Sequence, residues 1–557
     1  MEGKSLLRPV SMMKIKAIVH QEYIDPVIHS LGEMGCISFI DMRNKLNKFL
    51  KPVEPPEVYR KSLDIQARLT ELLRALNLQE VAMAEKVEMP KENLSELIVT
   101  YDENLKEIEK TYRKIYEDIA REILETTKGL EKEFTLTDEQ KLKMQRDILS
   151  ERLKTLVEDK TEELLRMLGV VKVINRMAHV WQFFGRTMDT YYFEAWVPEE
   201  KAEEVKDNIK TTSRGHCVVE AEKPNVDEEP PTLSKNPKLS EPYRRIVSSY
   251  GVPSYFEIDP TLIMTVLFPA LFGLMFADVG DGIILAASAL LMIKLRNRIK
   301  QSEGMIRTIL NGAELYLLCG IFAALYGLVF GEFFGFHIQP LLGFTLEMLP
   351  GIGEIFSPLE NPLKMFKLTL IVGTTVIALG LIINFVNKLI KRKYKEAFFE
   401  SACWFWFYVS LMYLVLFGFK LNIDLWFQNI NSVVFPLVIL PIILMILGNG
   451  FLHGPIEGFS FTFEAVISSI GNTLSFARIL ALNLAHSIFR SVLLMAWYGM
   501  GGIMGPVIMA IGTIFLILML EGLIVFIHTV RLNWVEWFSK FYKGEGIEYK
   551  PFTVKIE

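Results

Sequence analysis

The chain has 557 residues with 60 Lys+Arg and 65 Asp+Glu, and its mean hydropathy of +0.28 excludes a wholly water-soluble enzyme. Residues 1–258 carry 40 basic and 46 acidic groups, whereas residues 259–557 carry only 20 and 19. We therefore expect a soluble half followed by a membrane half. The near-neutral charge balance provides no basic field for nucleic acid, and the four widely spaced cysteines predict neither a disulfide framework nor a metal site.

The first twenty residues contain no long apolar core with a small-residue cleavage site, so they do not resemble a secretory signal. We therefore expect residues 1–240 to form a cytoplasmic domain. Alternating segments predict strands and helical periodicity predicts helices, which together indicate two small α/β lobes. The expected elements are the strand Met13–His20, the helix Asp25–Met34, the strands Cys36–Asp41, Val180–Phe184 and Tyr191–Val197, the helix Glu199–Lys210 and the strand Cys217–Ala221.

Between the lobes, an antiparallel coiled-coil hairpin is expected over about residues 57–168. Its first long helix has apolar positions at steps of 4, 3, 4, 3 and 4, the narrow seam that packs against another helix: Tyr101, Leu105, Ile108, Tyr112, Ile115 and Ile119. A second charged helix, Asp138–Leu168, would fold back on it. No GxxxxGK[ST] or GxGxxG motif occurs in this half, so another subunit must bind ATP if ATP drives this protein. We expect no cofactor.

Residues 241–258 are expected to link this domain to a transmembrane domain at 259–541. Eight apolar stretches lie there, each near the length that crosses a bilayer: Thr261–Phe276, Gly282–Ile293, Thr308–Phe330, Leu368–Val386, Cys403–Phe419, Val433–Leu447, Phe461–Met495 and Ile508–Val530. The first two are short and could be a bent hairpin or one long helix. The whole chain is thus predicted to be mainly α, with about eight transmembrane helices, the last two long and tilted.

The positions of the basic residues support the count of eight transmembrane helices, because these residues gather in the loops that the count places on the cytoplasmic side. They are Lys294, Arg296, Arg298, Lys300 and Arg307 in the first inner loop, and Lys388, Lys391, Arg392, Lys393 and Lys395 in the second. The tail at 542–557 also falls inside. We therefore expect a multi-pass protein of the cell membrane with both termini in the cytoplasm.

Ionisable residues lie inside the last two stretches, where each charge near the bilayer centre costs about 2.5 to 3.5 kcal/mol or more. At 100° per residue, Glu464 and Arg478 differ by only 40° in azimuth, with Ser475 on the same side. Glu521 and His528 again share one face, and Arg531 follows. Such residues face cavities or ion pathways by default. The alternatives are an Arg478 that only fixes packing, an Arg531 that reaches the interface, and buried structural histidines at positions 486 and 528.

One segment, Ser475-Phe476-Ala477-Arg478-Ile479-Leu480-Ala481-Leu482-Asn483-Leu484-Ala485-His486, resembles the SYxRLxALxLAH segment of a known family. This family is the membrane stator subunit, subunit a or subunit I, of rotary V-type and archaeal A-type ATPases. The segments Glu521-Gly522 and His528–Glu536, and the tail Phe541–Gly546, are similar to its last helix and C-terminus. Phe476 stands where the family usually has tyrosine, and Ala277 and Asp281 stand where it often has Gly and His.

The resemblance implies a stator against which a ring of proteolipid subunits turns. A ring carboxylate crosses lipid only when neutral, so two offset aqueous half-channels must load and unload its proton or sodium ion. Arg478, always charged, would separate them. Glu464, Ser475, Glu521 and His528 would line them, and the family suggests His486 and Arg531 as further contributors. The implied partners are the ring, the peripheral and central stalks, the ATP-hydrolysing head and the lipid bilayer.

Two other classes remain open at this point. A secondary transporter with a cytoplasmic regulatory coiled coil would use Arg478 to bind an anionic substrate, and inverted repeats would favour it, although no matching pair of broken segments is seen. A membrane scaffold would use the buried charges only for internal pairing.

Overall fold

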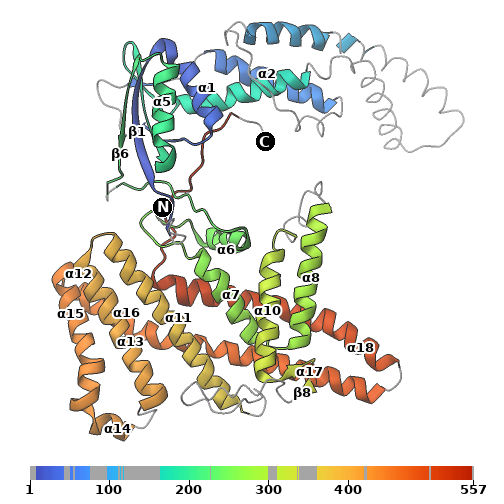
Figure 1. Ribbon diagram of the computed structural model, residues 1–557, viewed down its shortest axis with the longest axis vertical. Coiled ribbons are helices and arrows are strands. Elements are labelled where there is room, and N and C mark those ends of the chain that lie inside the picture. Colours follow the sequence, from blue (N-terminus) through green and yellow to red (C-terminus); the bar gives the residue numbers. More distant parts are fainter. Residues whose placement is uncertain are drawn as a thin grey trace, which may run out of the picture. The chain divides into compact units, whose positions relative to one another are not determined.

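The computed structural model describes residues 8–42, 51–53, 57–75, 97–110, 113–114, 117, 164–225, 228–298, 310–334, 336–337, 361–418, 423–500 and 503–554 (Figure 1). The chain divides into two compact units. We call Ser11–Pro230 with Tyr549–Glu557 the sheet unit, and Met1–Val10 with Pro231–Glu548 the helical unit. The last residues of the chain thus belong to the sheet unit.

The sheet unit is built on one six-stranded sheet of order β3-β4-β5-β1-β6, with β2 paired to β5. Its strands are β1 (Met12–His20), β2 (Ser38–Phe39), β3 (Lys51–Pro52), β4 (Gly185–Arg186), β5 (Thr190–Pro198) and β6 (Cys217–Glu222). Its helices include η1 (Gln21–Tyr23), α1 (Ile24–Met34), α2 (Glu57–Ala75), η4 (Glu199–Lys201) and α5 (Ala202–Thr212). β1 lies antiparallel between β5 and β6.

The expectation of two separate lobes is wrong, because β1 takes both of its partners from the segment beyond the expected hairpin. Local periodicity carries no information on pairing across so many residues. The strand expected at Val180–Phe184 is also wrong. Residues 164–181 are helical, and the chain turns before β4. Val180 and Trp181 belong to the buried face of this helix, so an apolar run that suited a strand closes a helix instead.

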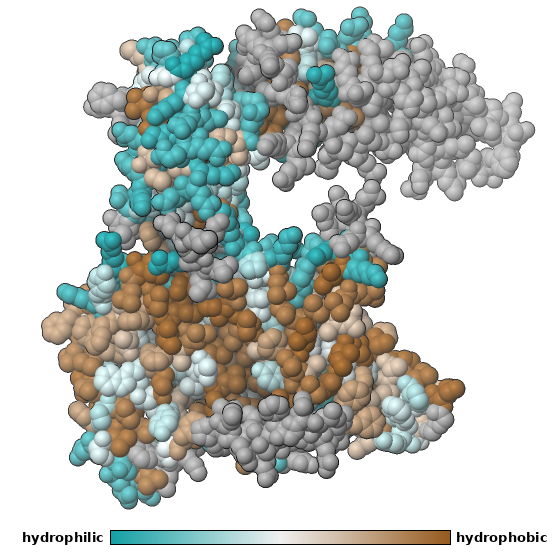
Figure 2. Space-filling model, viewed as in Figure 1, coloured by the Kyte–Doolittle hydropathy of each residue, from teal (hydrophilic) through white to brown (hydrophobic). Residues whose placement is uncertain are grey.

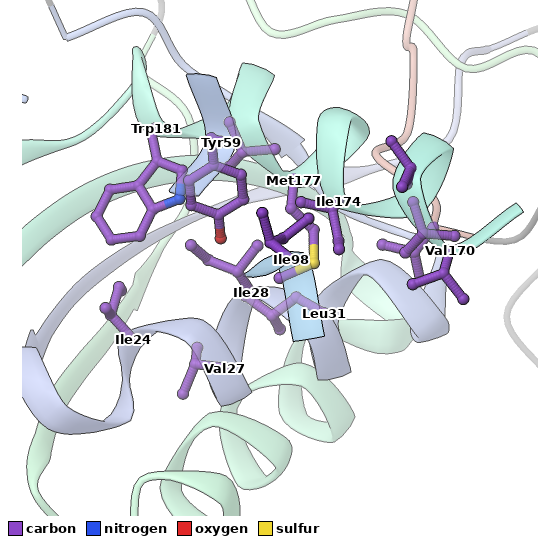
Figure 3. Packing of buried hydrophobic residues seen from close by; sticks show 14 of the residues in the cluster. Ile24, Val27, Ile28, Leu31, Tyr59, Ile98, Val170, Ile174, Met177 and Trp181 are labelled. Carbon is purple, nitrogen blue, oxygen red and sulfur yellow. The ribbon is translucent and has the colours of Figure 1, made fainter. Parts of the chain in front are cut away.

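The core of the sheet unit lies between the sheet and its helices. Side chains of α1, α2 and helix 164–181 interlock there, and Figure 3 shows Tyr59 and Trp181 beside Ile28. Residues spaced three or four apart on helix 164–181 are fully buried: Val170, Ile174, Met177 and Trp181. The C-terminal segment packs on the same core, because Phe552 N donates to Ile37 O and Tyr549 Oη donates to Cys36 O at 2.5 Å.

Two lysines on β1 differ in their surroundings. Lys14 is 5% exposed, and its Nζ lies 3.0 Å from Glu194 and 2.7 Å from Glu228. Lys16 pairs with Glu222 at 2.5 Å on a more exposed face. A buried cation with two carboxylates is costly to break, whereas an exposed pair contributes little.

Asp25 is a half-buried acid of the sheet unit. The Tyr59 hydroxyl donates to its Oδ1 at 3.1 Å. Burial raises the pKa of Asp25, and the bond from Tyr59 opposes this only in part.

Parts of the expected coiled-coil hairpin can be described. Arg68 on α2 donates Nε and Nη2 to the two carboxylate oxygens of Glu109 at 2.9 and 2.7 Å, and Nη1 to Asp102 at 2.8 Å. Helix 97–110 therefore lies along α2, with Leu105 and Ile108 buried. The remaining seam positions Tyr112, Ile115 and Ile119, and most of Asp138–Leu168, lie outside the described residues.

The helical unit begins with η5 (Lys238–Ser240) and α6 (Glu241–Tyr250), so the stretch 241–258 expected as a linker contains a helix. Then follow α7 (Thr261–Met275), α8 (Val279–Arg298), α10 (Ala313–Phe330), β7 (Glu332–Phe333), β8 (Phe336–His337), α11 (Pro362–Ile390), α12 (Tyr394–Glu396), η7 (Ala397–Ala402), α13 (Cys403–Tyr413), η8 (Leu414–Gly418), α14 (Ile423–Gln428), η9 (Ile430–Ile439), α15 (Leu440–His453), α16 (Pro455–Ser475), α17 (Ala477–Met500), α18 (Met504–Gly512), η10 (Thr513–Glu521), α19 (Gly522–Arg531), η11 (Leu532–Trp537) and η12 (Phe538–Lys540).

Six helical segments of the described chain are long and apolar enough to span a membrane: Ala313–Phe330, Pro362–Ile390, Tyr394–Gly418, Ile430–His453, Pro455–Met500 and Met504–Lys540. They overlap six of the eight expected stretches. The first two expected stretches correspond to α7, which has only 15 residues, and α8, and these are separate helices. Apolar side chains cover the visible face of this unit in a broad band (Figure 2). The chain is a multi-pass membrane protein.

Small residues let α8 approach α10 closely. A Cβ added at Gly282 would lie 2.5 Å from Ala324 N, and one added at Gly320 would lie 2.6 Å from Ala286 N. Each helix therefore presents a small residue at positions four apart, the pattern that allows membrane helices to touch through their backbones. This contact fixes the N-terminal end of α8, where Asp281 lies.

Candidate functional site

The segment with the ionisable residues is divided at Phe476. Phe476 N donates to Thr473 O and Ile479 N donates to Phe476 O, so the hydrogen bonds tighten to three-residue spacing between α16 and α17. The Phe476 ring is fully buried, and a Cβ at Gly373 of α11 would lie 2.6 Å from it. Phe476 thus anchors the junction in the helical unit, two residues before Arg478.

Arg478 lies at the start of α17 and is only loosely held within the chain. Its Nη1 is 3.6 Å from Glu536 Oε1, longer than a hydrogen bond, and has no hydrogen-bond partner among the described residues. The Arg478 side chain is 19% exposed, whereas that of Glu536 is 1% exposed. The guanidinium is therefore oriented by one buried carboxylate and keeps donors for another acceptor.

An outward-facing stripe runs along α16 and α17 on either side of Arg478. Its members are exposed and spaced mostly at three, four or seven residues: Glu464, Ile467, Gly471, Leu474, Ala481 and Ile488. A Cβ added at Gly471 would meet nothing within 4 Å. A small residue such as glycine on the surface of a membrane helix permits close approach of another helix. Glu464 and Arg478 therefore lie near a surface open to a partner.

The opposite face of α16 carries hydroxyl groups that bind other helices. Trp404 Nε1 donates to Ser469 Oγ at 3.0 Å, and Tyr408 Oη lies 2.8 Å from Thr473 Oγ1. Ser468 lies on the same side of α16 as Glu464, one turn along. Lys540 Nζ donates to its Oγ at 3.2 Å and lies 4.9 Å from the Trp404 ring centroid. This part of the unit is polar inside although it lies among apolar helices.

Farther along α17, His486 is completely buried between two carboxylates. Its Nε2 is 3.6 Å from Asp281 Oδ2, and its Nδ1 is 3.2 Å from Glu521 Oε2. The Phe276 ring covers it with a centroid separation of 4.7 Å. The structure therefore brings together two predicted site residues, His486 and Glu521, and adds a third group from α8.

The same carboxylate of Asp281 is held by Arg490. Arg490 Nε donates to Asp281 Oδ2 at 2.7 Å, and its Nη2 contacts the other oxygen. Its Nη1 donates to Thr513 at 2.9 Å, and the guanidinium lies 5.2 Å from the Phe334 ring centroid. Arg490 is completely buried, so this ion pair joins α8, α17 and η10 in a region without exposed charge.

Two further acids belong to this region, which we call the buried cluster: Asp278, Asp281, Glu332, His486, Arg490 and Glu521. Asp278 caps α8, accepting from Gly280 N at 2.7 Å and Asp281 N at 3.1 Å. Both oxygens of Glu332 lie 3.1 Å from Ser487 Oγ. Each member is at most 3% exposed. The buried cluster thus holds four carboxyl groups against one guanidinium and one imidazole.

Donor atoms of Asp278, Asp281 and His486 lie within 4.8 Å of one another, a spacing that could hold a metal ion. However, Arg490 already contacts both oxygens of Asp281. The guanidinium therefore provides the positive charge that a cation would bring, and we assign no metal to this cluster.

The other predicted residues lie apart from the buried cluster. Glu464 and Arg531 are exposed, whereas Ser475 and His528 are half-buried. The sequence analysis missed Arg490, although it is a charged residue in the same apolar stretch as Arg478. It also did not identify Glu536 and Lys540 as site residues; both lie beyond the last apolar stretch, Ile508–Val530. The sequence analysis noted Asp281 only as a departure from the family pattern. The signal that could have explained this departure is Arg490, a second arginine twelve residues after Arg478, because a buried arginine needs an acidic partner.

These features define a class of protein: a multi-pass membrane protein whose last two long helical segments carry buried charged groups and a partly exposed arginine. The family follows from comparison. The chain belongs to the V-type ATPase 116kDa subunit family, whose model matches residues 135–342 and 447–554. The second matched range contains Arg478, Arg490 and Glu521.

Relatives occur among archaeal and plant proteins. The chain is 28% identical over 450 residues to A-type ATP synthase subunit I of Methanocaldococcus jannaschii, covering 75% of this chain and 62% of the relative. It is 28% identical over 388 residues to the Pyrococcus horikoshii subunit I, covering 67% and 55%. V-type proton ATPase subunit a3 of Arabidopsis thaliana is 25% identical over 484 residues, covering 65% and 57%. The chain therefore spans about three-fifths of the length of these relatives.

Proposed function

We propose that this chain is the membrane stator subunit of a rotary A/V-type ATPase and couples movement of protons or sodium ions to ATP hydrolysis or synthesis in other subunits. The observation that supports this most is the position of Arg478. It is a permanent cation at a helix junction, held loosely at 3.6 Å from Glu536 and partly exposed beside an open stripe. A passing carboxylate of a ring subunit could pair with such a group.

The polar regions on either side of Arg478 are our candidates for the two half-channels. On one side are Glu464, Ser468, Ser475 and Lys540, and on the other is the buried cluster with His486 and Glu521. His528 and Arg531 follow on α19 as further lining groups. Carboxylates and imidazoles relay protons when water reaches them. Arg478 between the two regions would prevent protons or sodium ions from passing directly from one half-channel to the other. Its positive charge repels these cations, and the ring carboxylate must pair with it.

Several finer features belong to the same proposal. We infer eight membrane crossings, with α7 and α8 as the first two, both termini in the cytoplasm and the tail from residue 542 inside. The cytoplasmic domain would extend to about residue 240, and its α/β part would dock the peripheral stalk. The proteolipid ring, the stalks and the catalytic head would be the partners. The chain itself would be non-catalytic.

The alternative is a secondary transporter in which Arg478 binds an anionic substrate. Its partial exposure is compatible with that class, but the exposed glycine beside it favours a helix as the partner. Purification of the tagged chain from its native membranes separates the two. Co-purification of a small proteolipid and ATP-hydrolysing subunits is expected. A solitary, monodisperse chain with substrate-dependent transport would contradict the stator assignment.

A further inference from the structure

Arg490 has no role in the function proposed above, yet it is the only arginine in the buried cluster. Around it lie Asp281 of α8, Glu521 of η10, Asp278 at the N-terminus of α8, Glu332 of β7 and His486 of its own helix. If every acid were ionised, four negative charges would face at most two positive ones. Such an excess is not tolerated in a buried, apolar environment, so the cluster must hold bound protons.

Geometry decides which groups those protons can occupy. Arg490 contacts both oxygens of Asp281, which favours the ionised form of that carboxylate and fixes it in one orientation. The Oδ2 atom is also 3.6 Å from His486 Nε2. On the other side of the ring, Glu521 Oε2 is 3.2 Å from Nδ1. His486 thus has two acidic partners: Asp281, which Arg490 fixes, and Glu521, which Arg490 does not contact.

We propose that Arg490 is a positioning residue of the ion path, which fixes Asp281 beside His486 and thereby sets the pH at which the buried cluster binds and releases the transported proton. This inference rests on the proposed function. In one transfer, the Glu521 carboxyl gives its proton to Nδ1 while Nε2 gives its own to the Asp281 carboxylate. One O–H and one N–H bond break, one N–H and one O–H bond form, and no other reactant is needed. The reverse steps restore the starting state.

A purely structural ion pair would behave differently. It would hold α8 against α17, and its loss would lower stability or assembly without moving the pH dependence of transport. The proposal instead requires charge effects of opposite sign. Arg490→Gln leaves an additional uncompensated acid, so protons bind more tightly. Asp281→Asn leaves an uncompensated guanidinium, so they bind less tightly.

The test is the pH profile of ATP-driven proton pumping by the assembled complex in vesicles. Arg490→Gln should move the midpoint upward, and Asp281→Asn downward, by about 1 to 3 pH units each, the effect of one opposite charge within bonding distance. The double variant should return toward the wild-type midpoint. The partly buried pair Lys388–Glu400 provides matched controls, because Lys388→Gln and Glu400→Gln remove charges outside the cluster. These two should leave the midpoint unchanged.

A second measurement covers variants that assemble but do not pump. Infrared titration of protonated carboxyl groups in the purified complex should show the same opposite shifts. Midpoints that do not move, or that move in the same direction in both single variants, would overturn the role of Arg490. The proposed function fails separately: it fails if Arg478→Lys pumps normally, whatever the Arg490 variants do.

Discussion

Replacing Gly320 with alanine should loosen the contact between α8 and α10. The new Cβ would lie 2.6 Å from Ala286 N, whereas ordinary contact begins at 3.4 Å, so the helices must separate by about 0.8 Å. Overpacking of this size costs about 1 to 3 kcal/mol, and the better helix propensity of alanine returns about 1 kcal/mol. We expect a net destabilisation of up to about 2 kcal/mol.

Thermal unfolding in detergent can be followed with a thiol-reactive fluorophore, because Cys319 and Cys403 are buried in the helical unit and react only after unfolding. Gly471→Ala is the matched control, since its Cβ would meet nothing within 4 Å and should leave stability unchanged or raise it by up to about 1 kcal/mol. If Gly320→Ala unfolded at or above the temperature of Gly471→Ala, the argument from close helix contact would be refuted.

Two further predictions concern the sheet unit. Lys14→Ala should cost about 3 kcal/mol, because it leaves two carboxylates without their buried cation, whereas Lys16→Ala on the same strand should cost less than about 1 kcal/mol. Hydrogen exchange of the β1 amides measures both, and equal losses of protection would contradict the difference in burial. Asp25 has a raised folded-state pKa, so its contribution to stability is greatest below its unfolded pKa of about 4 and is lost as pH rises through the folded value. Asp25→Asn should therefore gain melting temperature relative to the wild type as pH rises, and a constant difference across pH would exclude this reasoning.

The sequence predicted the elements whose signal is local. The β1 strand, α1, β5, α5 and β6 were expected at nearly the observed residues, and each of the eight apolar stretches overlaps helices. Pairing of β1 with strands 170 or more residues away could not be read from periodicity, so one sheet was expected as two lobes. The run from Val180 to Phe184 shows the ambiguity of short apolar segments, which suit a strand or the end of a buried helix equally.

The candidate site was predicted only in part, for a similar reason. Residue type and helical position identified Arg478, His486 and Glu521 as charges that need compensation. They did not show that His486 touches Glu521, nor that Asp281 from a distant helix completes the contact. Asp281 and Arg490 are 209 residues apart in the chain, and no local pattern encodes their contact.

The most direct test of the proposed function is ATP-driven ion pumping by the assembled complex with Arg478→Lys. Lysine keeps the charge but lacks the planar guanidinium and can lose its proton on burial, so it cannot reliably separate the half-channels. Arg245→Lys, at an exposed position of α6, is the matched control and should pump normally. We expect the Arg478→Lys complex to assemble and to lose pumping. Pumping near the wild-type rate would contradict the assignment of Arg478 as the charge that separates the two ion paths.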